Sequence, residues 1–173
     1  TRTSYAIPHS AGSFVAENSL IARNIGDGKN IAIGSFLKIN VGSGPYQISA
    51  PVSVNGENFI YVANQGEASV SVIRVKDNVV VATIPVGSEA YGLATLVRSG
   101  VTYVYVANTN ADTVSVINTS SNSVIATVPV GVKPYYVAAA GSKIYVTNGQ
   151  SNTVSVINAN TNTLAATITV GNY

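Results

Sequence analysis

The chain of 173 residues contains no cysteine and few charges. Without cysteine it can form neither a disulfide framework nor a thiolate zinc site. Charged residues make up only 9% of the sequence, so the polarity of the surface must come from Ser, Thr, Asn and Gln. The nine Lys and Arg residues are scattered, and the formal net charge is +2. Such a chain has little field with which to attract nucleic acid, and we expect no nucleic-acid partner.

Long apolar runs are also missing. No run approaches the ~18 residues that a membrane span needs, and no signal-peptide pattern stands at the start. The chain begins at Thr1 without methionine, as expected of a secreted protein after signal removal or of a trimmed chain. Asn118-Thr119-Ser120 is a glycosylation acceptor pattern in a predicted turn. We therefore expect no membrane span, an extracellular or cell-surface location, and Asn118 as the candidate glycosylation site.

An internal repeat dominates what is present. Three segments open on Tyr-Val and close on Val-Gly, at 61–87, 105–131 and 145–171, and in each the first and last residues are 26 positions apart. The N-terminal residues fit the same template in degenerate form, with Tyr5-Ala6-Ile7, Phe14-Val15-Ala16 and Ile39-Asn40-Val41-Gly42 at equivalent places. We therefore predict one domain, residues 1–173, of four units at about 1–42, 43–87, 88–131 and 132–173.

Each unit is predicted to contain four β-strands. In the last unit the apolar runs lie at about 135–139, 143–147, 153–158 and 163–170. Asn55-Gly56, Gly141-Ser142 and Asn148-Gly149 supply turns, because Asn and Gly tolerate positive φ. No segment has the apolar stripe and caps of a helix. The sequence therefore predicts an all-β fold.

Some strand interiors are apolar on both alternating faces, as in Val79-Val80-Val81-Ala82 and Ile144-Tyr145-Val146. Such strands predict sheets that are covered on both faces. Four-stranded sheets stacked around an axis, with a repeat of ~40–45 residues, form a β-propeller. We expect either a four-bladed ring or an open arc completed by another copy. Uncovered end faces and strand edges favour a homo-oligomer or polymer.

The repeats resemble the YVTN family of β-propeller repeats. Tyr145-Val146-Thr147-Asn148 gives the family's tetrapeptide, and Tyr61-Val62-Ala63-Asn64 and Tyr105-Val106-Ala107-Asn108 are variants of it. The resemblance is strong over about 42–171 and weak over 1–41. It implies a propeller, usually of seven blades, of a kind common in archaeal surface-layer and other extracellular proteins. It implies no single chemistry, so no catalytic residue carries over.

Candidate catalytic and metal-binding groups are few. His9 is the only histidine and lies beside Ser10, with Asp27, Asp77 and Asp112 as conceivable partners. A triad is recognised by placement, and the flanking Pro8 and Gly12 indicate a turn instead. The segment Gly26-Asp27-Gly28-Lys29-Asn30 lacks the Walker glycine and the second EF-hand carboxylate, so it is interpreted as a hairpin turn. We expect no enzyme, no catalytic residue, no metal site and no cofactor; calcium held by turn Asn side chains stays open.

Four tyrosines occupy equivalent positions in the units: Tyr5, Tyr46, Tyr91 and Tyr135. They could ring one mouth of the propeller and stack on sugar rings. Alternatively each packs in or near the core, with its hydroxyl bonded to a neighbouring turn. The leading hypothesis is a non-catalytic extracellular structural protein, a self-associating subunit of a surface layer, filament or adhesin. The alternative is a propeller module that binds cell-surface glycans or another ligand.

Overall fold

The computed structural model describes residues 20–23, 30–33 and 38–171, and the chain divides into two units, Thr1–Asn40 and Val41–Tyr173. In the first unit β1 (Leu20–Arg23) pairs antiparallel with β2 (Asn30–Ile33), with Arg23 opposite Asn30. The hairpin turn predicted around Asp27 falls between these strands, in residues outside the described ranges. The strands predicted at 5–7 and 14–16 lie outside those ranges too.

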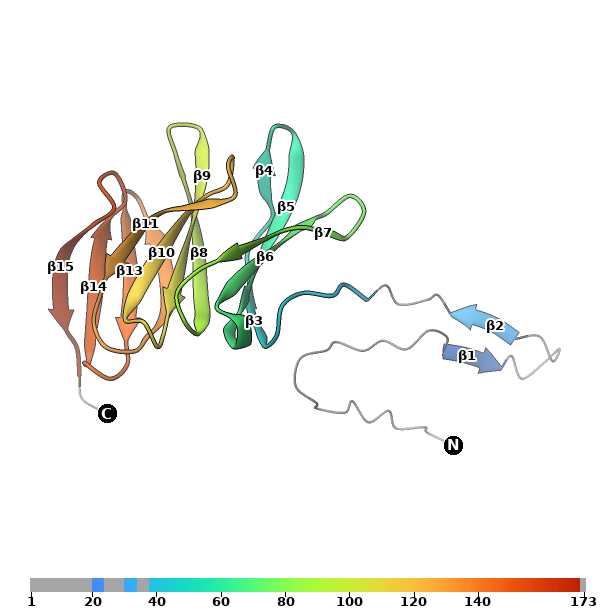
Figure 1. Ribbon diagram of the computed structural model, residues 1–173, viewed down its shortest axis with the longest axis horizontal. Helices are drawn as coiled ribbons and strands as arrows, with labels where there is room; N and C mark the ends of the chain where they lie inside the picture. Colours follow the sequence, from blue (N-terminus) through green and yellow to red (C-terminus); the bar gives the residue numbers. More distant parts are fainter. Residues whose placement is uncertain (1–19, 24–29, 34–37, 172–173) are drawn as a thin grey trace. The chain divides into compact units, whose positions relative to one another are not determined.

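The second unit consists of three antiparallel sheets, which we call blades (Figure 1). We call the first strand of each blade inner, because β3, β8 and β12 lie beside one another, and we call the last strand outer. The first blade comprises β3 (Pro45–Ile48), β5 (Glu57–Asn64), β6 (Ser69–Arg74) and β7 (Val79–Pro85), with the short β4 (Val52–Val54) also paired to β5. The middle blade comprises β8 (Ala90–Arg98), β9 (Val101–Asn108), β10 (Thr113–Asn118) and β11 (Ser123–Pro129). The last blade comprises β12 (Pro134–Ala140), β13 (Lys143–Asn148), β14 (Thr153–Asn158) and β15 (Thr163–Thr169).

The all-β prediction is confirmed, and the only helical element in the described ranges is the 3-10 turn Gln65–Glu67. Two of the predicted turns have the expected positive φ, with 51° at Asn55 and 56° at Gly141. At the third, Asn148 is the last residue of β13, and the positive φ of the turn falls on Asn152 instead, at 52°. The turn between the third and fourth strands of each blade ends on an asparagine in the same left-handed conformation. These residues are Asn78, Asn122 and Asn162, with φ of 58°, 47° and 54°.

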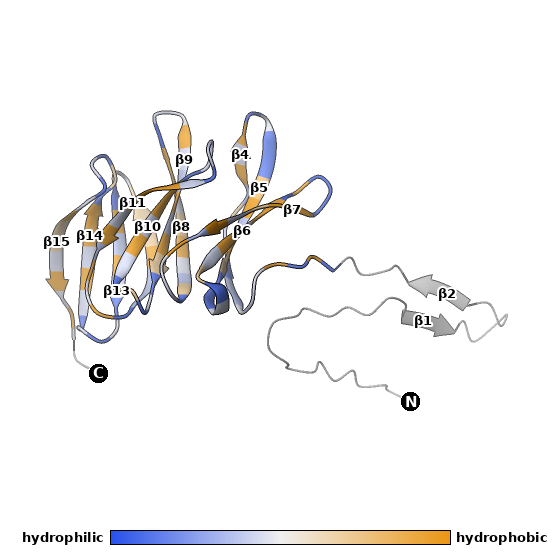
Figure 2. Cartoon of the chain, viewed as in Figure 1, coloured by the Kyte–Doolittle hydropathy of each residue, from blue (hydrophilic) through white to orange (hydrophobic). Residues whose placement is uncertain are grey.

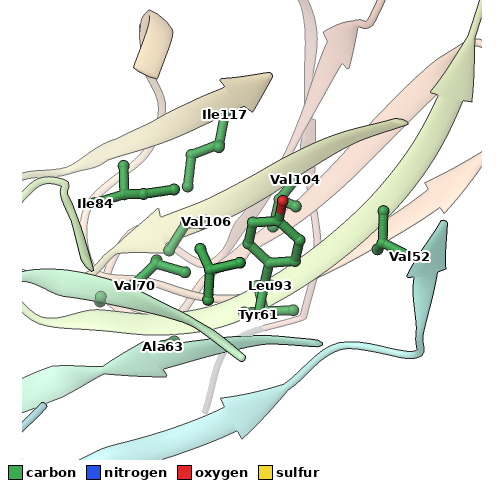
Figure 3. Close-up of a cluster of buried hydrophobic side chains, with 11 residues drawn as sticks. Val52, Tyr61, Ala63, Val70, Ile84, Leu93, Val104, Val106 and Ile117 are labelled. Atoms are coloured by element: carbon green, nitrogen blue, oxygen red, sulfur yellow. The ribbon is translucent and has the colours of Figure 1, made fainter. Parts of the chain in front are cut away.

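Two apolar clusters hold the blades together. The first lies between the first and middle blades, where the Tyr61 ring packs among Leu93, Val104 and Val106 (Figure 3). The second lies between the middle and last blades, with Tyr105 and Val116 facing Ile144 and Ile157. The middle blade is therefore buried on both faces, as the sequence predicted for doubly apolar strands.

The same prediction is wrong for β7 and for part of the last blade. Val79 and Val81 on β7 are 46% and 40% exposed. Strand β13 alternates buried positions with exposed or half-buried ones. Strand β15, which carries hydrophobic residues near its end (Figure 2), is exposed along its whole length. The reason is position: β7 is an outer strand, and within Val41–Gly171 the last blade has a neighbouring blade on only one face.

The inner strands β8 and β12 approach each other closely at Gly92. A Cβ atom at this position would lie 2.2 Å from the Tyr135 carbonyl oxygen. Only glycine allows the middle and last blades to pack at this distance.

Candidate functional site

The inner strands of the three blades bring four tyrosines together: Tyr46, Tyr91, Tyr135 and Tyr136, hereafter the tyrosine cluster. The Tyr46 and Tyr91 ring centroids are 3.7 Å apart. Tyr91 meets Tyr135 and Tyr136 edge-on, at 5.3 and 6.2 Å. The Tyr46 and Tyr136 hydroxyls are 3.5 Å apart, and this contact raises the pKa of Tyr136 above its ordinary value.

The cluster is partly open to solvent. Tyr46 and Tyr136 are 46% and 56% exposed, while Tyr91 and Tyr135 are half-buried. The Tyr135 ring is covered on one side by Gly149, where a Cβ atom would come within 2.6 Å of it. The Gln47 side chain joins the first and middle blades beside the cluster, because it exchanges two 3.1 Å hydrogen bonds with the Leu93 backbone. The site therefore offers exposed aromatic faces on an ordered base.

Three of the four tyrosines that the sequence singled out belong to this cluster, and Tyr5 lies outside the described residues. Tyr136 was missed; the doubled tyrosine at 135–136 was the available signal. The alternative, a hydroxyl bonded to a neighbouring turn, does not apply to Tyr46, whose hydroxyl meets that of Tyr136. Such bonds belong instead to tyrosines of the repeat tetrapeptide.

A hydrogen bond of this second kind joins each blade to the next. The Tyr61 hydroxyl donates to Asn122 Oδ1 at 2.8 Å, in the β10–β11 turn of the middle blade. The Tyr105 hydroxyl donates to Asn162 Oδ1 at 3.3 Å, in the β14–β15 turn of the last blade. Both tyrosines are fully buried, and burial raises the pKa of Tyr61 to about 12 and that of Tyr105 above its ordinary value. We call this contact the tyrosine–asparagine bond.

The asparagine that ends each tetrapeptide has an architectural role. The Asn108 Nδ2 donates to Thr113 and Ser115 at 3.0 and 2.9 Å, which ties β9 to β10. Asn64 and Asn148 make the same pair of bonds in their own blades. The closing glycine before each blade packs on this amide, and a Cβ atom at Gly87 would lie 2.6 Å from Asn108. The repeated residues thus explain the fold and supply no reactive group.

The carboxylates once considered for a triad are engaged in structure where they are described. Asp77 pairs with Arg74 at 2.7 Å, which holds the pKa of the Asp77 carboxyl below its usual value. Asp112 Oδ1 accepts a 2.8 Å hydrogen bond from the Lys133 backbone. His9, Ser10 and Asp27 lie outside the described ranges. Among the described residues no group of three or more His, Cys, Asp or Glu side chains could hold a metal.

Asn118 lies at the end of β10, and its Oδ1 accepts a 2.8 Å hydrogen bond from the Ser120 backbone. Asn158 makes the same contact with Asn160 in the last blade, where no acceptor pattern is present. This turn therefore has a structural reason, and glycosylation of Asn118 stays a prediction. None of the described helical residues forms a segment long and apolar enough to cross a membrane.

Comparison with known proteins shows the fold. No protein-family model and no curated protein matches the sequence. Among solved structures, hydrazine synthase of Kuenenia stuttgartiensis is 24% identical, with a TM-score of 0.67 over 75% of this chain and 37% of its own. The dihydro-heme d1 dehydrogenase NirN is 12% identical, with a TM-score of 0.62 over 90% of this chain and 34% of its own. AztD from Citrobacter koseri is 16% identical, with a TM-score of 0.58 over 88% and 42%.

These neighbours are β-propeller proteins of differing function, so the likeness shows that this chain has a propeller-type fold and nothing more. The chain spans between 34% and 42% of the length of these three proteins.

Proposed function

We propose that this protein is a non-catalytic, self-associating structural subunit of an extracellular or cell-surface assembly, such as a surface layer, filament or adhesin. The supporting observation is a stack of three blades whose two end faces carry exposed apolar side chains. Propellers close with about four to eight blades, whereas the unit Val41–Gly171 contains three. On this proposal the repeats are of the YVTN type, residues 1–42 are a degenerate fourth unit, and another copy of the chain completes the stack.

The last blade presents an apolar surface where its counterparts are buried. We call this surface the trailing face; it carries Tyr145, Val154, Ile168 and Val170. Ile168 pairs with Val154 as Val128 pairs with Val114 in the middle blade. Val128 is 2% exposed against the last blade, whereas Ile168 is 47% exposed and Val170 is 44% exposed. The difference measures what a further blade would cover.

The first blade presents the complementary surface, which we call the leading face and which carries Ile48, Ile60 and Val75. Ile48 pairs with Val62 as Leu93 pairs with Val106 in the middle blade. Leu93 is 3% exposed, but Ile48 is 57% exposed and Val75 is 37% exposed. Completing the burial of such half-exposed side chains stabilises by about half of the ~1.5–3 kcal/mol that full burial provides.

Light scattering over a range of concentrations tests the proposal. We expect the mass to rise above that of one chain as the concentration increases, and Ile168→Lys to oppose that rise by placing a charge on the trailing face. Ile125→Lys is the matched control, because Ile125 is 45% exposed on the outer strand of the middle blade. A single-chain mass at every concentration contradicts self-association, and equal effects of the two lysines contradict the assignment of the face.

The tyrosine cluster favours a second candidate function, a module that binds glycans or another ligand. Exposed aromatic rings stack on sugar faces, and Tyr46 and Tyr136 are the most exposed rings of the cluster. The chain has no tryptophan, so tyrosine emission reports directly on such binding. If the protein has this function, oligosaccharides should change the tyrosine emission. Tyr136→Ala should abolish that change and leave the thermal stability unaltered. An unchanged emission with a panel of oligosaccharides contradicts it.

A further inference from the structure

The tyrosine–asparagine bond is present at both blade interfaces. At the ends of the stack, the last blade carries the equivalent tyrosine and the first blade carries the equivalent asparagine, each without the other. Tyr145 occupies the position of Tyr61 and Tyr105, since it pairs with Val156 as Tyr105 pairs with Val116. Asn78 occupies the position of Asn122 and Asn162, in the turn before the outer strand. The last blade therefore carries a donor, and the first blade carries an acceptor.

Tyr145 and Asn78 are both accessible to a partner. Tyr145 is half-buried where Tyr61 and Tyr105 are fully buried, and its hydroxyl has no hydrogen-bond partner within the described ranges. The Asn78 side chain is exposed. Its turn is already formed, because the Asn78 N–H donates to the Arg74 carbonyl at 2.9 Å, as the Asn162 N–H donates to Asn158 at 2.8 Å.

A charged residue lies near each of the two halves of the bond. Lys143 pairs with Asn158 in the last blade as Tyr103 pairs with Asn118 in the middle blade. Tyr103 packs in the cluster that joins the middle blade to the next one. Lys143 is exposed, so a further blade in the same arrangement would meet its ammonium group. In the first blade the turn that ends on Asn78 carries Asp77, which is already paired with Arg74, and Lys76 beside it, so charge does not select the contact.

We propose that the trailing face of the last blade docks on the leading face of the first blade of a second copy of this chain, in the register set by a hydrogen bond from Tyr145 to Asn78 of that copy. This inference rests on the proposed self-association and adds its partner, direction and register. The contact joins two different surfaces, so it repeats head to tail and produces a ring if the rotation closes or a filament if it does not.

The competing occupant of the leading face is the chain's own N-terminal segment. In the repeat template the position of Tyr61 is taken there by Phe14, which has no hydroxyl. That segment cannot donate to Asn78 in the way that Tyr61 donates to Asn122. The last blade of a second copy can, because it retains tyrosine at this position.

Sedimentation of the full chain tests the register with Tyr145→Phe and Asn78→Gly, the latter because glycine keeps the left-handed turn. We expect each variant to weaken self-association roughly fivefold, the value of one ordinary hydrogen bond. The double variant should be no weaker than either single variant, because both remove the same bond. Tyr136→Phe is the matched control and should associate like the wild type, since its hydroxyl meets Tyr46.

Mixing the two single variants tests the direction. In a head-to-tail contact, Tyr145 of the Asn78→Gly chain meets Asn78 of the Tyr145→Phe chain, so the mixed pair should regain wild-type affinity. Labelled Tyr145→Phe chain should therefore sediment faster with unlabelled Asn78→Gly chain than with unlabelled Tyr145→Phe chain. No gain on mixing overturns the head-to-tail register.

The outcomes separate this inference from the function on which it rests. If Ile168→Lys reduces association while Tyr145→Phe and Asn78→Gly leave it unchanged, self-association stands and the Tyr145–Asn78 register is wrong. If the wild-type chain remains single at every concentration, both proposals fail.

Discussion

Replacing Tyr61 with phenylalanine removes one hydroxyl from the interface between the first and middle blades and leaves the ring in place. The lost contact is the 2.8 Å hydrogen bond to Asn122 Oδ1. A neutral hydrogen bond contributes roughly 0.5–1.5 kcal/mol net, and a buried acceptor left without a donor costs more. Asn122 is only half-buried, so we expect water to replace part of the lost donor. We therefore expect Tyr61→Phe to lower the free energy of unfolding by about 1 kcal/mol near pH 8.

The pH dependence gives the same variant a second readout. Burial raises the pKa of Tyr61 to about 12 in the folded chain, against 10.0 for an ordinary tyrosine. Because the folded pKa is the higher one, the stability from the neutral phenol is fully present below about pH 10 and is lost as the pH rises toward 12. By about pH 11 this ionisation has lowered the free energy of unfolding of the wild type by roughly 1.4 kcal/mol, a loss that the phenylalanine variant does not suffer. The difference between the two proteins should therefore vanish or reverse near pH 11.

Urea unfolding at several pH values between about 8 and 11, followed by circular dichroism, measures both effects. Tyr145→Phe is the matched control at dilutions where the chain is single, because its hydroxyl has no partner within the described ranges. The control should be nearly neutral. Equal stability of wild type and Tyr61→Phe at pH 8, or a difference that stays constant up to pH 11, refutes the role assigned to this bond.

Two further substitutions test the packing of the blades. Gly92→Ala places a Cβ atom 2.2 Å from the Tyr135 carbonyl oxygen, so calorimetry should show a loss of unfolding free energy of ~1–3 kcal/mol. Gly171→Ala, where no atom lies within 4 Å of the added Cβ, should be nearly neutral. Similar losses for the two variants argue against the close approach at Gly92. Ile144→Ala empties a fully buried position between the middle and last blades and should cost ~2–5 kcal/mol in urea unfolding. Ile125→Ala, at a side chain that is 45% exposed, should cost far less, and equal costs contradict the placement of the cluster.

Most of the fold could be predicted from the sequence repeat. The strands predicted in the last unit agree with β12 to β15 to within one residue at each end, because alternating apolar runs end at Asn- and Gly-rich turns whose spacing is constant. The fold class followed from strand count and period, and the solved neighbours agree with it.

The candidate site was less accessible from sequence because burial depends on neighbours that a repeat does not specify. Val128 and Ile168 occupy the same place in their blades, yet one is 2% and the other 47% exposed, since only one has a blade beside it. The tetrapeptide tyrosine looked like a strand landmark, whereas Tyr61 reaches the turn of the next blade. Tyr136 joins the tyrosine cluster by meeting Tyr91 of the middle blade, and the doubled tyrosine at 135–136 does not by itself specify a contact between blades.

Negative-stain electron microscopy of the purified full chain is the most direct test of the central claim that copies associate through their blade faces. At concentrations where light scattering reports association, we expect rings or filaments built from repeating blade stacks, and their loss in Ile168→Lys but not in Ile125→Lys. Fields that contain only separate single-chain particles at those concentrations, or assemblies that Ile168→Lys leaves intact, contradict the claim.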